Sequence, residues 1–99
     1  MSYVHIVPEI LSAAAHDLQS IGAAVEAHNA AAAAPTTGVI PAAADEVSAL
    51  TAAQFVAHGQ MYHAVSARAA AVHQALVTTL ATSAGCYAAT EAANAAAAG

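Results

Sequence analysis

Two alanine-rich stretches, separated by a short segment of proline, glycine and β-branched residues, constrain what this 99-residue chain can form. About a third of the residues are alanine, which has the highest intrinsic helix propensity. The separating segment, Pro35-Thr36-Thr37-Gly38-Val39-Ile40-Pro41, combines residues that are unfavourable inside a helix. The sequence therefore predicts an all-α fold, an antiparallel hairpin of two helices whose loop covers residues 34–44.

The first helix is predicted over residues 8–33. Pro8 suits a first helical turn, where its missing N–H is not needed, and Glu9 places negative charge at the positive end of the helix dipole. Apolar residues then recur at spacings of three and four, which predicts one seam: Leu11, Ala14, Leu18, Ile21, Val25, His28 and Ala32.

The second helix is predicted over residues 45–84, since Asp45 can cap it, Glu46 adds first-turn charge and Gly85 is the next strong stop. Residues 85–99 have little apolar bulk and are expected to form a mobile tail. If the chain folds about Val39 or Ile40, Gly22 lies near Gly59 and Leu18 near Tyr62.

Apolar side chains cover nearly half the circumference of the second helix, too much for one neighbouring helix to bury. They are Val47, Leu50, Phe55, Ala57, Met61, Tyr62, Val65, Ala69, Val72, Leu76 and Leu80. Ala52 and Ala70 are expected on the opposite side of the helix. The apolar face is therefore wider than the hairpin alone can cover.

Charge and composition exclude several classes of function. Six carboxylates stand against one arginine, Arg68, and no lysine, which excludes counterion-release binding to nucleic acid and attraction to anionic lipid headgroups. Cys86 is the single cysteine, so no intrachain disulfide is expected. No window is apolar enough for a transmembrane helix, and Pro8 and Glu9 interrupt any cleavable signal sequence.

No arrangement of residues indicates an enzyme, a metal site or a cofactor. The six histidines show neither an HExxH motif nor a Cys/His ligand spacing. His63 and Ser66 share one helical turn, but nothing nearby supplies an oxyanion hole or an orienting carboxylate. Near the C-terminus, Tyr87 and Glu91 lie four residues apart and would share one face of a helix.

Several of these segments, in this order, resemble the mycobacterial PE family, which is named for a Pro-Glu near the N-terminus, here Pro8-Glu9. The others are Asn29-Ala30-Ala31-Ala32, the loop Pro35-Thr36-Thr37-Gly38-Val39, the stretch 41–48 and the pattern Tyr87 to Glu91. The chain is most similar to the short PE proteins associated with the fifth type VII (ESX) secretion system.

The resemblance implies a heterodimer with a PPE protein, two helices from each forming an elongated four-helix bundle. It implies that Tyr87 and Glu91 form the general type VII secretion motif, and that a cytosolic chaperone contacts the PPE subunit. Export would then lead from the cytosol to the cell envelope or out of the cell, with a role in envelope permeability or host interaction. The residues expected at the partner interface are Leu11, Leu18, Ile21, Val25, Leu50, Phe55, Met61, Tyr62, Val65, Val72 and Leu76.

A second hypothesis from a different class is a free-standing surface-active or membrane-associated alanine-rich helix protein. Alanine richness alone permits it. Thr51, Thr78, Thr79, Thr82 and Thr90, however, show none of the regular spacing that an ice-binding array requires.

Overall fold

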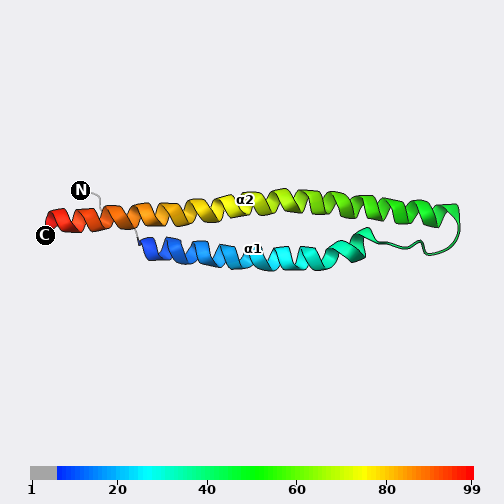
Figure 1. Ribbon diagram of the computed structural model, residues 1–99, viewed down its shortest axis with the longest axis horizontal. Coiled ribbons are helices and arrows are strands. Elements are labelled where there is room, and N and C mark those ends of the chain that lie inside the picture. The colour runs from blue at the N-terminus through cyan, green and yellow to red at the C-terminus, as the bar shows by residue number, and fades with distance from the viewer. Residues whose placement is uncertain (1–6) are drawn as a thin grey trace.

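The computed structural model describes residues 7–99, which form two helices and the loop between them (Figure 1). Helix α1 spans Pro8–Thr37 and helix α2 spans Glu46–Ala98. They run antiparallel in a rod that measures 80 × 22 × 16 Å, and no strand occurs within the described residues. The predicted all-α hairpin is confirmed.

Helix α1 begins at Pro8, as predicted, but continues past residue 33 to Thr37, so the loop covers residues 38–45 and not 34–44. The hydroxyls of Thr36 and Thr37 donate to the carbonyls of Ala32 and Ala33, both at 2.6 Å, and the Gly38 N–H donates to Ala34 at 2.9 Å. These hydrogen bonds stabilise the last turn of the helix. The helix can continue past Pro35, because this proline removes only the single backbone hydrogen bond that its own nitrogen would have made. Figure 1 shows the end of α1 bending toward α2.

Helix α2 begins with Asp45 as its N-cap, as the sequence indicated. One carboxylate oxygen accepts the Ser48 N–H at 2.8 Å and the other accepts the Ser48 hydroxyl at 3.0 Å. The pKa of Asp45 lies below its ordinary value of 3.8, chiefly because the Ser48 N–H and then its hydroxyl stabilise the charged form.

The predicted end of the second helix at residue 84 is wrong, because α2 continues through Gly85 to Ala98. None of the described glycines has a positive φ, so Gly85 does not form the left-handed cap that ends many helices. One glycine costs about 1 kcal/mol of helix stability relative to alanine, and the following alanine-rich residues have high helix propensity. The predicted mobility of residues 85–99 stays a prediction.

The alignment of the two helices also differs from the prediction. Gly22 lies against His73, not Gly59, and Gly59 lies against Thr36. The prediction assumed a tight turn about Val39 and Ile40, whereas the loop is extended and runs beside the first turns of α2 (Figure 1). As a result, α2 starts well beyond the end of α1, and every facing pair is shifted.

The face of α2 that packs against α1 consists mainly of small and β-branched residues at alternating spacings of four and three. We call this face the small-residue seam, and its buried or half-buried residues are Ala52, Val56, Gly59, His63, Ser66, Ala70, His73, Val77, Leu80 and Ala84. On α1 the matching residues are Leu11, Ala15, Leu18, Gly22, Asn29 and Ala33. Small side chains let the two helix axes approach closely.

Ala52 and Ala70, predicted to lie away from the packed side, therefore belong to the seam. Ala52 is only 7% exposed and Ala70 is half-buried. The prediction followed side-chain size, since the largest apolar residues usually pack together. Here close approach of the backbones selects the smallest ones, and a charge at Ala52 or Ala70 is expected to disrupt the hairpin.

Two glycines in α2 allow a matched test of this packing. A Cβ at position 59 would lie 2.6 Å from the Thr36 carbonyl oxygen, whereas one at position 85 would meet nothing within 4 Å. Gly85→Ala should stabilise the chain by roughly 0.5–1 kcal/mol through helix propensity. Gly59→Ala should destabilise it despite the same gain in propensity, because backbone must move. Thermal unfolding followed by circular dichroism measures both; equal shifts would contradict the close contact.

The Asp45 cap predicts a pH dependence. A carboxyl whose pKa is lowered on folding contributes stability above its ordinary pKa, and this stability is lost as pH falls through the folded value. The unfolding midpoint should therefore fall in acid below about pH 4. Asp45→Asn retains an acceptor oxygen but does not titrate, so its midpoint should fall less across the same range. Identical pH profiles for the two proteins would show that this carboxylate does not contribute.

Candidate interaction surface

Large apolar side chains of α2 lie exposed beside the small-residue seam. All seven α2 residues expected at a partner interface are exposed, from Leu76 at 48% to Val72 at 71%; the others are Leu50, Phe55, Met61, Tyr62 and Val65. On α1, Ile21 and Val25 are also exposed, whereas Leu11 and Leu18 are half-buried in the hairpin. We call the nine exposed side chains the apolar face.

The helical spacing places both parts of the apolar face on the same side of the hairpin. The contacts agree, because Ile21 and Val25 of α1 line a hollow of about 640 Å³ together with Tyr62 and Ala69 of α2. A second hollow, of about 700 Å³, lies near the loop and is lined by Phe55, Met61 and Val65 with Pro35 and Val39. Ridges and hollows of this size suit the interlocking side chains of neighbouring helices.

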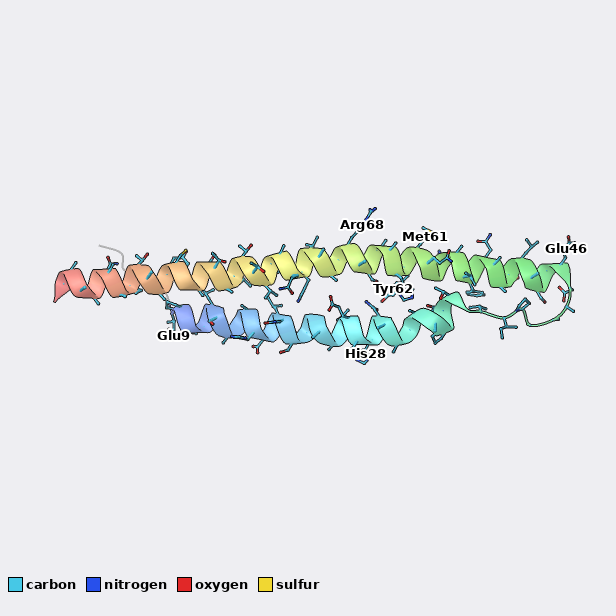
Figure 2. All side chains as sticks on the ribbon, viewed as in Figure 1. Glu9, His28, Glu46, Met61, Tyr62 and Arg68 are labelled. Carbon is cyan, nitrogen blue, oxygen red and sulfur yellow. The ribbon has the colours of Figure 1, made fainter. Side chains whose placement is uncertain are left out.

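Three polar contacts cross from α2 to α1 within the middle of the hairpin. The Tyr62 hydroxyl donates to Asn29 Oδ1 at 2.7 Å, and Figure 2 shows Tyr62 between the two helices. His73 Nε2 lies 2.6 Å from the Leu18 carbonyl oxygen, so this nitrogen carries a proton and donates. These contacts join the helices where neither supplies large buried side chains.

His63 makes the third contact, with its Nε2 2.9 Å from Thr36 Oγ1. The Thr36 hydroxyl already donates to the Ala32 carbonyl, so His63 is the donor here. The Tyr62 and His63 rings meet edge to face, with centroids 5.3 Å apart. From the sequence alone, these histidines are candidates for metal ligands, solvated residues or partner contacts. Their spacing of three or four from Gly59, Ser66 and Ala70 is the signal that places them in the seam.

The predicted secretion residues lie near the C-terminal end of α2, the end of the helix that extends past the start of α1 (Figure 1). Because the helix is continuous there, Tyr87 and Glu91 are one turn apart and share a face. Tyr87 is 42% exposed, and Glu91 is exposed. Cys86, beside them, is a free and exposed thiol.

Within residues 7–99, no three His, Cys, Asp or Glu side chains gather where they could hold a metal ion. Neither helix in this part of the chain has a stretch that is long and apolar enough to cross a membrane. Ser66 and His63, the pair weighed for catalysis, both line the groove between the helices, but the His63 ring is bonded to Thr36.

Comparison with known proteins gives a consistent result. The model of the PE family matches residues 4–94. The chain is 70% identical to the PE family protein PE13 of Mycobacterium tuberculosis over 98 residues, which are 99% of each chain. It is 58% identical to PE8 and 55% identical to the esterase PE16 of the same organism, of which it spans 36% and 18%.

Proposed function

The chain belongs to the PE family, and we propose that it acts without enzymatic activity as the PE half of a heterodimer with a PPE protein. A type VII secretion system, the fifth by resemblance, would export the pair from the cytosol to the cell envelope or out of the cell. There the pair would contribute to the permeability of the envelope or to interaction with the host. The exposed apolar face is the observation that carries this proposal.

A helical partner fits the apolar face better than a flat surface does. The face runs along one side of a narrow rod and combines side chains from both helices. Two further helices laid along it would complete a four-helix bundle and cover the hollows beside Phe55 and Val25. A contiguous apolar surface of this kind commonly marks a protein interaction site.

The non-enzymatic part of the proposal rests on the chemistry of the groove between the helices. A serine nucleophile needs a histidine base within hydrogen-bond reach and donors for the oxyanion. His63 instead donates to Thr36, and no hydrogen bond joins it to Ser66. The name of PE16 describes a protein of which this chain spans 18%, so that activity is not carried over.

The partner face predicts a difference between two sides of α2. Phe55→Asp or Leu76→Asp should weaken binding to the PPE protein by at least about 100-fold, because an unpaired charge would be buried where an apolar side chain stood. Ala53→Asp, at an exposed position whose seven-residue row contains no member of the apolar face, should leave binding nearly unchanged. Co-expression with tagged PPE proteins and size-exclusion chromatography measures this.

The control also separates the hypotheses. A free-standing surface-active helix protein would use the same apolar face on vesicles or interfaces, so it would not co-elute with any PPE protein. Loss of co-purification by Ala53→Asp as strongly as by Phe55→Asp would contradict the assignment of the face.

Export and assembly are predicted to depend on different residues. Tyr87 and Glu91 lie beyond the small-residue seam, so Tyr87→Ala and Glu91→Ala should leave the heterodimer intact while blocking its appearance in the envelope or culture filtrate. Cell fractionation with both partners tagged measures each step. If Tyr87→Ala caused the heterodimer to dissociate, the tyrosine would be a packing residue. Normal export of both variants would refute the assignment of these residues as a secretion motif.

A further inference from the structure

The small-residue seam repeats every seven residues, which makes it ambiguous as an alignment signal. Sliding α2 by seven residues along α1 brings the next residues of the seam, most of them small or β-branched, to the same face, at a displacement of about 10 Å. Contacts between alanine methyl groups are weak and alike at each position. Packing of the alanines alone therefore does little to favour the observed alignment over its neighbours.

Four contacts in the hairpin are specific to the observed alignment. Gly59 lies so close to Thr36 that a Cβ would come within 2.6 Å of the carbonyl oxygen. Tyr62 donates to Asn29, His63 donates to Thr36 and His73 donates to the Leu18 carbonyl. Hydrogen bonds are directional, and each of these has a defined partner on the other helix.

A shift of seven residues in either direction removes every one of these contacts. A shift in one direction places four other residues, in order, where Gly59, Tyr62, His63 and His73 had been: Ser66, Ala69, Ala70 and Leu80. The other direction replaces them by Ala52, Phe55, Val56 and Ser66. Neither set offers a ring donor or a phenol to α1, and both place a Cβ against the Thr36 carbonyl.

We propose that Gly59, Tyr62, His63 and His73 are register-determining residues, which select one alignment of the hairpin among those that the seam permits. Polar residues in an otherwise apolar helix interface specify alignment in this way, often at a cost in stability. The alignment matters for the apolar face, because it sets Ile21 and Val25 beside Tyr62. A slipped hairpin would separate the two halves of that face by about 10 Å.

Spin labels on the full chain test this directly. With Cys86→Ser, cysteines at the exposed positions Ala13 and Ala53 carry the labels, and pulsed electron resonance measures their separation in frozen dilute solution. The parent should give one main distance. The variant Gly59→Ala, Tyr62→Phe, His63→Leu, His73→Leu should retain its helicity and show a second distance displaced by about 10 Å. Each lost hydrogen bond should raise the ratio of slipped to native hairpins about fivefold.

A matched control makes the same four chemical changes where no contact crosses to the other helix. It carries His16→Leu, His28→Leu, Gly85→Ala and Tyr87→Phe, and should keep the parent's single distance. A single unchanged distance in the first variant, or a second distance in the control, would overturn the proposal.

Single changes at His73 decide the question if the first variant loses its helicity. His73→Gln retains a donor for the Leu18 carbonyl and His73→Leu does not. A second distance in the leucine variant alone supports the proposal, and identical distances in both overturn it. The measurement needs no partner protein. A result that overturns the register proposal would therefore leave the proposed PPE heterodimer unaffected, and failure to find that heterodimer would leave the register proposal unaffected.

Discussion

The close approach of two helices along small side chains is the constraint on which the rest of this structure depends. Gly59 contacts the backbone of Thr36, and Gly22 leaves room for the His73 ring. Small and β-branched side chains allow the helices to lie this close, and the buried apolar residues within 7–99 are Ala15, Ala52, Val77 and Ala84. Most of the large apolar side chains of α2 lie beside this seam and remain exposed, whereas Leu80 of α2 and Leu11 and Leu18 of α1 are half-buried in it.

That arrangement leaves the hairpin with little core of its own. Burying a large apolar side chain contributes about 1.5–3 kcal/mol, whereas an alanine methyl contributes much less. Most of the large apolar side chains lie on the apolar face, and they contribute hydrophobic stabilisation only when another surface covers them. The polar contacts of Tyr62, His63 and His73 supply directional interactions across a seam in which no leucine, isoleucine or aromatic side chain is buried.

The sequence predicted the helices and their order well, because alanine content, Pro8 and the Asp45 cap act locally. Helical spacing alone also places Phe55, Val65 and Leu76 on one side of α2, but the sequence assigned that side to the packing of the hairpin, which instead uses the small residues beside it. The alignment could not be predicted this way. It depends on an extended loop and on contacts such as His73 with Leu18, which lie far apart in sequence. Helix ends at Pro35 and Gly85 were also misplaced, because neighbouring threonines and alanines outweighed the helix-breaking residues.

The central claim is that the small-residue seam joins the two helices and the apolar face is free for a partner. Hydroxyl-radical footprinting, read by mass spectrometry on the chain alone and in complex with its PPE protein, tests this most directly. Phe55 and Met61, which are 61% and 64% exposed, should be oxidised readily in the chain alone and several-fold more slowly in the complex. His16, outside the apolar face, should react equally in both. Slow oxidation of Phe55 and Met61 in the chain alone, or equal rates in both states, would contradict the claim.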